Sequence, residues 1–420
     1  MKKIKTKKFR AVNGKALIVT ADIGKDKHYG YWRSPDGTDV KPFCFANKGS
    51  GFQEFWTLIS RAKEKHQLEE IVFGYESTGP YAEALVHFMR ARGARLVQVN
   101  PMHTKRVKEL QGNSPNKTDQ KDPKVIADII ELGRALTVVI PEGAAAELRR
   151  LTQARERSIQ RHTALANQLQ GLIAIIFPEF LQVMKNVKTA TAKHLLNDFP
   201  TPEEVMAQGI ENLSQIVRKT SRGKLGEDRA QALYEAAESS VGVTEGRSSI
   251  ILEVRAILAA METSEQFTAN LEAEMVLQLK QIPYSGSILS LKGIKEVTAA
   301  GLIGEVGDFR KFRTIGEIMK LAGLDLFEIS SGKHKGMRRI SKRGRPLLRK
   351  LLYFAALNTV RKGGVMHCQY RQYLDRGMIK TKALIAVARK LFGIIFAIVR
   401  DHSVYKEDYM ATLPQLKEAA

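Results

Sequence analysis

The first hundred residues alternate short β-rich runs with amphipathic segments in an order that few folds share. From Ala16 the sequence reads ALIVTADI, then HYGYW, then VKPFCFAN, and Gly, Asp and Pro separate the runs. An amphipathic segment over 51–66, the run IVFGYE, a helical segment over 81–92 and the run LVQVN follow. The pattern predicts an antiparallel three-strand meander followed by helix, strand, helix and strand.

This order of elements is typical of an RNase H-like domain with a mixed sheet, which we assign to residues 1–142. A further segment, 116–132, has apolar residues at helical spacing and predicts a helix packed on that sheet. Thr118 or Asp119 would be its N-cap. Pro123 would then lie in the first turn, where a missing N–H costs little. The expected fold class is therefore α/β for this part of the chain.

Four carboxylates occupy positions that suit a metal site. Asp22 ends the first strand and Glu76 ends the fourth, and these strands are neighbours in an RNase H-like sheet. Asp119 and Asp122 are three residues apart at a helix start, which places them on one helical face. Because Mg²⁺ prefers oxygen ligands, these four carboxylates predict a binding site for Mg²⁺ or Mn²⁺. For each acid alone, a role as turn or cap residue remains the alternative.

The middle of the chain, residues 143–281, has heptad-like apolar spacing that predicts a helical hairpin or coiled-coil arm. Arg155, Ser158 and His162 interrupt the first of its two seams. Residues 186–247 are less periodic and predict a compact helical insert without an assigned role. The apolar positions are Leu148, Leu151, Leu165, Leu169, Leu172 and Ile176 in one seam, and Ile250, Val254, Ile257, Met261, Leu271 and Met275 in the other.

The last part, residues 282–420, predicts a small and mostly helical domain. In SLKGIKEVTAAGLIGEVGDFRKF a turn at Gly293 joins two short helical patterns, which is typical of a helix-hairpin-helix. Such elements bind phosphate through backbone amides, although simple helix packing explains the pattern equally well. A final helix rich in Ala, Ile and Phe ends near Arg400.

The charge of the chain indicates a polyanionic partner. Lys and Arg number 67 against 44 Asp and Glu, a formal net charge of +23. Between Lys333 and Lys350, nine of 18 residues are Lys or Arg and none is acidic, which suits phosphate binding. The predicted nucleic-acid contacts are Lys333, Lys335, Arg338, Arg339, Lys342, Arg343 and Arg345.

Membrane and redox roles find no support in the sequence. No apolar run approaches the roughly 18 residues of a membrane helix, and the start MKKIKTKKFR lacks an apolar signal core. We therefore expect a cytoplasmic protein without a membrane partner. Cys44 and Cys368 have neither metal-ligand nor redox spacing, so we interpret them as buried or incidental thiols.

Over nearly its whole length, the chain resembles the DEDD transposases of bacterial insertion sequences, that is, insertion-sequence family 110 and its relatives. The resemblance lies in the motifs and in their order. The motifs are ADIGKDKHYG, GYESTGPY and NKTDQKDPKVIA, then SLKGIKEVTAAGLIGEVGDF and SSGKHKGMRRISKRG. The resemblance implies a RuvC-like domain, a coiled-coil region and a small C-terminal transposase domain with a nucleophilic serine. That serine maps to Ser330 or to its neighbour Ser331, and we favour Ser330.

The resemblance also implies a bacterial or archaeal recombinase guided by a structured bridge RNA, which pairs with donor and target DNA. We expect a homo-oligomer, either a dimer or a tetramer. A serine hydroxyl is a weak nucleophile until a base or a metal assists it, and no obvious His or Glu base stands beside Ser330. We therefore expect the carboxylates, from the same or a partner subunit, to position a metal at the phosphate that the serine attacks.

Two other functions stay open at this point. The chain could be a metal-dependent nuclease of the junction-resolving kind, in which the four carboxylates hydrolyse DNA with water and the serine is structural. It could also be a non-catalytic assembly protein that binds RNA or DNA. Acids clustered in a strongly basic chain argue against the assembly protein, because carboxylates near a phosphate path weaken binding unless a metal neutralises them.

Overall fold

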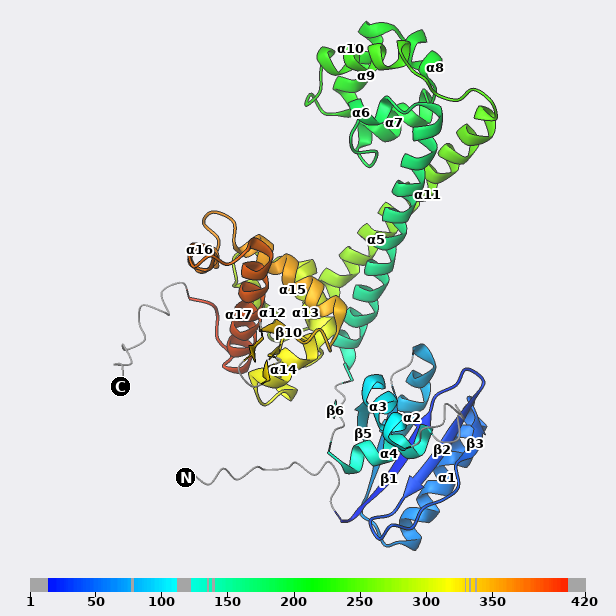
Figure 1. Ribbon diagram of the computed structural model, residues 1–420, viewed down its shortest axis with the longest axis vertical. Coiled ribbons are helices and arrows are strands. Elements are labelled where there is room, and N and C mark those ends of the chain that lie inside the picture. Colours follow the sequence, from blue (N-terminus) through cyan, green and yellow to red (C-terminus); the bar gives the residue numbers. More distant parts are fainter. Residues whose placement is uncertain are drawn as a thin grey trace, which may run out of the picture. The chain divides into compact units, whose positions relative to one another are not determined.

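The protein divides into two compact units, residues 1–139 and residues 140–420, and we describe each by itself. The computed structural model describes residues 14–76, 79–111, 122–133, 136–137, 140–328, 330–331, 334–336 and 338–406. Figure 1 shows a sheet with helices in the first unit and an almost entirely helical second unit. We call them unit 1 and unit 2.

Unit 1 is built on a six-stranded mixed sheet in the order β3-β2-β1-β4-β5-β6. The first three strands form an antiparallel meander, β4 and β5 continue parallel to β1, and β6 is antiparallel to β5. The predicted mixed α/β sheet is confirmed, and its strand order is compatible with an RNase H-like fold. The strands are β1 (Ala16–Asp22), β2 (Lys27–Arg33), β3 (Phe43–Ala46), β4 (Glu70–Glu76), β5 (Arg95–Val99) and β6 (Leu136–Thr137).

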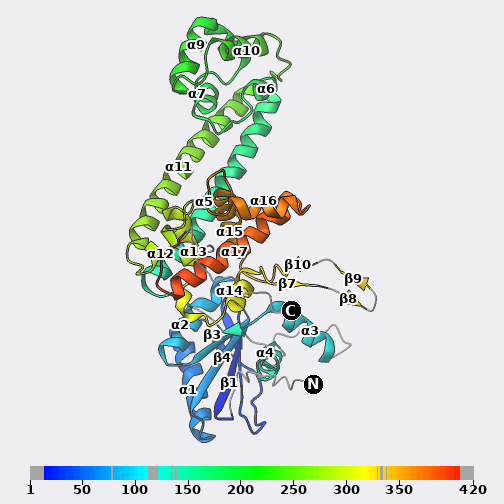
Figure 2. The same ribbon diagram turned by 90° about the vertical axis from the view of Figure 1, so that its left-hand side faces the viewer.

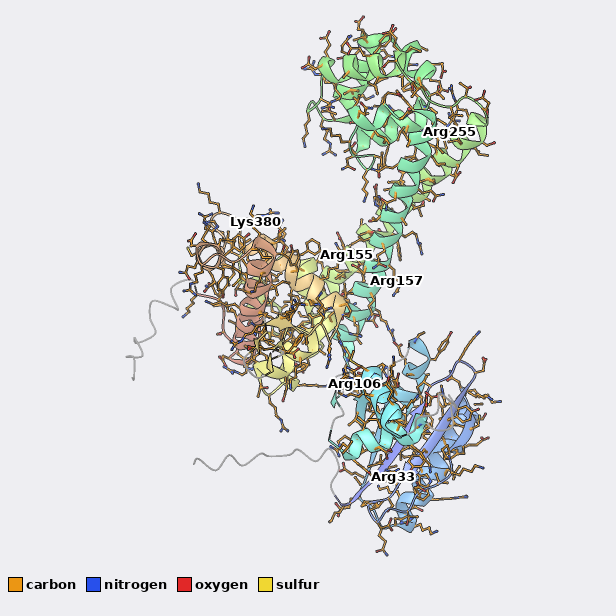
Figure 3. All side chains as sticks on the ribbon, in the orientation of Figure 1. Arg33, Arg106, Arg155, Arg157, Arg255 and Lys380 are labelled. Carbon is orange, nitrogen blue, oxygen red and sulfur yellow. The ribbon has the colours of Figure 1, made fainter. Side chains whose placement is uncertain are left out.

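Apolar helix faces cover both sides of this sheet. On one side, Phe55 of α1 is fully buried and stacks on Phe45 of β3. On the other side, the apolar residues of α4 pack against β1, β4 and β5 in one buried cluster. On that side Arg33 of β2, labelled in Figure 3, also binds Asp128 of α4 at 2.7 Å. The helices are α1 (Gly49–Lys65), η1 (Pro80–Ala82), α2 (Glu83–Ala91), α3 (Pro101–Gln111) and α4 (Asp122–Glu131).

The helix predicted over 116–132 is present from Asp122 onward. Pro123 is its second residue, as expected from the missing N–H. The predicted N-cap residues, Thr118 and Asp119, lie outside the described residues. The amphipathic spacing therefore correctly predicts the packing of α4, whose four periodic apolar residues are all buried: Val125, Ile126, Ile129 and Ile130.

Two long helices, α5 (Gly143–Ile176) and α11 (Arg247–Leu279), pack side by side and form the arm of unit 2 (Figure 1). The predicted helical pairing is present, while knobs-into-holes packing stays a prediction. The residues that interrupt the apolar seam are paired. Arg155, labelled in Figure 3, binds Glu272 at 2.6 Å, and Ser158 hydrogen-bonds Ser264. The polar layer in the arm is thus satisfied by contacts between its two helices.

A compact helical insert joins the far ends of the two arm helices (Figures 1 and 2). Its buried apolar residues, such as Phe180, Leu195 and Leu233, form one cluster with the adjoining ends of α5 and α11. The helices of the insert are α6 (Phe180–Val183), α7 (Ala190–Asp198), α8 (Pro202–Ala207), α9 (Gly209–Thr220) and α10 (Glu227–Glu238).

At the other end of the arm, α13, α15 and α17 form the core of the C-terminal helices around Phe309, Leu352 and Phe392. No helix among the described residues has the length and apolarity needed to cross a membrane. Cys44 and Cys368 are both exposed, so neither is a buried thiol. The helices are α12 (Ser285–Leu289), α13 (Glu296–Val306), η2 (Phe309–Lys311), α14 (Ile315–Ala322), α15 (Pro346–Thr359), α16 (His367–Asp375) and α17 (Lys380–Arg400).

Close contact between α13 and α5 depends on Gly304. A Cβ at this position would lie 2.7 Å from the backbone carbonyl carbon and oxygen of Leu148. We expect Gly304→Ala to lower the free energy of unfolding by about 1–3 kcal/mol, because two backbones must move apart. Chemical denaturation followed by circular dichroism measures this.

Gly171 on the exposed side of α5 is the matched control, since a Cβ there meets nothing within 4 Å. Gly171→Ala should raise stability by about 0.5–1 kcal/mol through the helix propensity of Ala. Equal effects of the two substitutions would contradict the packing role of Gly304.

Candidate active-site residues

Two of the four predicted carboxylates end neighbouring strands of unit 1. In the parallel pair β1 and β4, Ala21 lies opposite Tyr75, so Asp22 and Glu76 follow as the last residues of the two strands. Both side chains are half-buried. The parallel register therefore brings both acids to the same edge of the sheet.

Both acids also lie on the sheet face that α4 covers. Side chains alternate between faces along a strand. Thr20, two residues before Asp22, donates a hydrogen bond at 2.7 Å to the carbonyl oxygen of Pro123 in α4. Gly74, two residues before Glu76, faces Ile130 of α4 so closely that a Cβ would lie 2.2 Å from its Cδ1. Asp22 and Glu76 therefore extend beside the start of α4.

Asp122 is the first residue of α4 and belongs to the same region of unit 1. Its side chain is only 16% exposed, and Lys108 of α3 places its Nζ 2.5 Å from Oδ1. The ammonium group supplies the positive charge that a half-buried carboxylate requires. Asp119, the fourth predicted carboxylate, lies outside the described residues.

The donor chemistry of this edge fits a hard divalent cation. Asp22, Glu76 and Asp122 offer carboxylate oxygens from two strand ends and one helix start, and a cationic group already rests on one of them. Within the described part of the chain, however, no group of three or more His, Cys, Asp or Glu side chains is gathered closely enough to hold an ion. The three acids share a region but do not form a closed coordination shell.

His28 of β2 is a buried residue near this edge that sequence reasoning missed. Its Nδ1 accepts a hydrogen bond from the backbone N–H of Gly24, in the turn that follows Asp22. Gly24 itself tolerates no Cβ, which would lie 2.3 Å from the carbonyl oxygen of Lys27. Burial lowers the pKa of His28 and keeps the imidazole neutral, while a hydrogen bond with Asn47 opposes this shift. In the sequence, a lone histidine between Lys27 and Tyr29 gives no signal that it is buried or that it holds the turn after Asp22.

The two predicted serines lie in a β-ribbon that extends from the helices of unit 2 (Figure 2). Ser330 pairs with Lys335 and Ser331 pairs with His334. Closer to the helices, Phe327 pairs with Arg339 and Leu326 with Ile340. The side chains of the serine pair and its partner strand lie outside the described atoms. The strands are β7 (Leu326–Phe327), β8 (Ser330–Ser331), β9 (His334–Lys335) and β10 (Arg339–Ile340).

The base of the ribbon is fixed to the helices by close backbone contact. Gly323, with a φ of +64°, and Gly344 approach so closely that a Cβ on Gly344 would lie 2.3 Å from the Gly323 nitrogen. Ser341 binds the Asp325 carboxylate at 2.5 Å through its Oγ. Arg349 donates to the carbonyl oxygen of Ala322 at 2.9 Å. The ribbon therefore begins from a defined point on the domain.

The predicted nucleic-acid contacts fall into three groups. Arg339, Lys342 and Arg343 are exposed, and Arg338 is exposed while binding Glu328 at 2.9 Å. Arg345 is half-buried and donates to the carbonyl oxygen of Glu305, so its guanidinium already serves the interior of the domain. For the other two, the side chain of Lys335 is not described, and Lys333 lies outside the described residues.

The turn at Gly293 is exposed and lies against α15 of unit 2. A Cβ on this residue, whose φ is +105°, would lie 3.2 Å from Thr359 Cγ2 of α15. Packing against α15 therefore accounts for the glycine. Phosphate binding by a helix-hairpin-helix at this place stays a prediction.

Two family models of transposases match the chain. One, described as "Transposase", matches residues 19–178 and so includes the sheet edge with Asp22, Glu76 and Asp122. The other, described as "Transposase IS116/IS110/IS902 family", matches residues 286–371 and includes the ribbon with the two serines. The two models thus cover the two regions in which the predicted site residues lie.

Two known insertion-element proteins are similar to this chain over nearly their whole length, and a third over about two thirds of its length. The IS116 uncharacterized 44.8 kDa protein of Streptomyces clavuligerus is 25% identical over 93% of this chain and 96% of its own length. The IS110 uncharacterized 43.6 kDa protein of Streptomyces coelicolor is 21% identical over 93% and 95%. The transposase for insertion sequence element IS1111A of Coxiella burnetii is 23% identical over 69% of each chain.

Acidification tests the neutral state of His28. Because burial lowers its pKa below the usual 6.5, the unfolded chain takes up a proton before the folded one as pH falls. The stability contributed by neutral His28 is present above pH 6.5 and is lost progressively below it. Both tryptophans, Trp32 and Trp56, lie in unit 1, so their fluorescence during denaturation reports this unit.

The matched variant is His28→Gln, which cannot titrate. It should lose less stability than the wild type between pH 7 and pH 5. A variant with the same pH dependence as the wild type would show that His28 is not the group responsible.

Proposed function

The chain belongs to the IS110/IS116 family of transposases, and on this premise we propose that it is an RNA-guided DNA recombinase with a serine nucleophile. Ser330 is the proposed nucleophile, and Ser331 is its alternative. Its partners are donor DNA, target DNA and a structured bridge RNA. The expected assembly is a homo-oligomer acting in the cytoplasm.

The observation that carries this proposal is the anchored ribbon. A nucleophile must be held in place to act efficiently, because positioning supplies much of the rate. The contact between Gly323 and Gly344 and the Ser341–Asp325 hydrogen bond fix where the ribbon leaves the domain. The following basic run, which contains no acid from Lys333 to Lys350, suits the phosphate on which the serine would act.

In the proposed reaction, Ser330 Oγ attacks a DNA phosphorus and forms a phosphoserine ester. The phosphorus–oxygen bond to one deoxyribose breaks, and the hydroxyl proton passes to the leaving oxygen. A deoxyribose hydroxyl of the exchanged strand then attacks the same phosphorus and gives its proton to the serine oxygen, which restores a phosphodiester and releases the serine. Arg338, Arg339 and Lys342 would stabilise negative charge on the phosphate oxygens during both steps.

We assign the divalent ion, Mg²⁺ or Mn²⁺, to the sheet edge of unit 1. Asp22, Glu76 and Asp122 would hold it together with Asp119, displacing the Lys108 ammonium from Asp122. When bound, the ion supplies positive charge for a phosphate oxygen. The residues of the chain provide the anionic oxygens and, through the hydrogen bond from Gly24 to His28, a fixed turn after Asp22.

The proposal assigns one task to each part of the chain. Residues 1–142 are the RuvC-like DEDD domain with the ion site. Residues 143–281 are the coiled-coil region with its insert, and residues 282–420 are the transposase domain with the nucleophile. Arg343 joins the exposed basic residues as a backbone contact, because base pairing with the RNA would select the DNA sequence.

Trapping of a covalent adduct tests the nucleophile. In a reaction with donor DNA, target DNA and bridge RNA, the wild type should form a denaturation-resistant adduct whose DNA maps to Ser330. Ser330→Ala should abolish this adduct and strand exchange while leaving RNA binding unchanged. Ser331→Ala is the matched control and should retain the adduct.

The reverse pattern would move the nucleophile to Ser331. Free cleaved ends without any adduct would instead support the junction-resolving nuclease, in which water attacks. Normal recombination by both single variants would contradict a serine nucleophile.

Metal binding can be measured apart from activity. At a Mn²⁺ concentration of about 100 times its Kd, one bound ion stabilises the folded state by about 2.7 kcal/mol, which raises the Tm. Asp22→Asn and Glu76→Gln should each remove most of this rise. Asp26→Asn, in the exposed turn after β1, is the matched control and should respond like the wild type. An unchanged response in Asp22→Asn and Glu76→Gln would contradict the ion site.

A further inference from the structure

The helical insert contains an open groove that none of the steps above uses. It has a volume of about 640 Å³ and lies where the loop after α6 meets the loop between α9 and α10. Lys185 and Asn186 line one side, and Lys224 and Arg229 line the other. Hydroxyl groups of Thr189, Thr191, Thr220 and Ser221 complete the polar lining.

The groove is basic even though the insert as a whole is not. Its lining includes Lys185, Lys224 and Arg229 but no Asp or Glu. Within the described part of the chain, Lys185 and Lys224 make no ion pair, and Arg229 donates a hydrogen bond to the carbonyl oxygen of Val183 at 2.6 Å. Three positive charges therefore meet in one groove without a neutralising carboxylate.

Two other cations near the insert are neutralised. Lys193 of α7 binds Glu265 at 2.6 Å, and Arg247 binds Glu203 at the same distance. These pairs form where acids are within reach. The groove cations differ because the surrounding acids of the insert lie outside its lining. Unpaired cations gathered at one place raise the local potential and attract anions.

We propose that this groove binds the phosphodiester backbone of a nucleic acid strand, at a site separate from the active-site residues. Lys185 and Lys224 would pair with phosphate oxygens from the two sides of the groove. Asn186 would donate a further hydrogen bond to the backbone through its side-chain amide nitrogen. Because these groups recognise phosphate and sugar rather than base edges, binding would be independent of sequence.

The side chains of the groove also hold its shape without a ligand. Arg229 joins α10 to the last residue of α6, and Thr220 donates to Thr191 at 3.1 Å. These contacts link α10 with α6 and α9 with α7. Lys185 and Lys224 can therefore be substituted without removing a contact that supports the insert.

Salt-dependent binding by the full chain tests the proposal. The probes are poly(U) RNA and a random-sequence DNA duplex, which distinguish the two sources of phosphate backbone. Lys185→Glu and Lys224→Glu, tested singly, should each weaken binding of at least one probe about fivefold to tenfold near 0.1 M salt. Each should also reduce the slope of log K against log salt concentration by about 1.

Arg255→Glu is the matched control, since Arg255 is exposed on α11 beside the opposite end of α7, where it donates to the carbonyl oxygen of Asn197 (Figure 3). This substitution changes the net charge by the same amount as each lysine substitution. The salt-dependence slopes for RNA and for DNA should both stay near the wild-type values. A selective loss for RNA or for DNA identifies the bound strand. Wild-type binding by both lysine variants, or an equal loss in Arg255→Glu, would overturn the proposal. Neither result depends on the serine, which trapping tests separately.

Discussion

Parallel pairing of β1 with β4 is the constraint on which unit 1 depends. The register of this pair ends both strands together, so that Asp22 and Glu76 share an edge and a face of the sheet. The small Gly74 then lets α4 approach the same face, and the hydrogen bond from Thr20 to Pro123 secures the start of that helix. A shift of one residue in the register would send the two acids to opposite faces.

In unit 2, a helical domain must hold a short β-ribbon in a fixed position. Two-residue strands contribute few hydrogen bonds and cannot hold their position alone. The domain therefore fixes the base: Gly323 and Gly344 bring two backbones together, and Arg349 and Arg389 bind carbonyl oxygens of the same segment. The small residue Gly304 allows α13 to pack closely on α5, so the arm and the domain share one core.

Much of the sheet was predictable from sequence because its strands are apolar and its helices amphipathic. The apolar runs that end at Asp22 and Glu76 predict both strand ends, and the spacing from Val125 to Ile130 predicts the buried face of α4. The ribbon was not predictable, because its strands have two residues each and much of the segment is basic. The pairing of Lys108 with Asp122 and the groove in the insert arise from tertiary contacts between separate elements, which no local pattern encodes.

The central claim is that the chain exchanges DNA strands through a covalent serine ester. Each in-line displacement at phosphorus inverts its configuration, so two successive displacements retain it. The direct measurement is strand exchange with a DNA whose reacting phosphate is a phosphorothioate of single configuration, followed by analysis of the joined product. The account predicts retention of configuration at phosphorus. Inversion would show a single displacement and would contradict the serine intermediate.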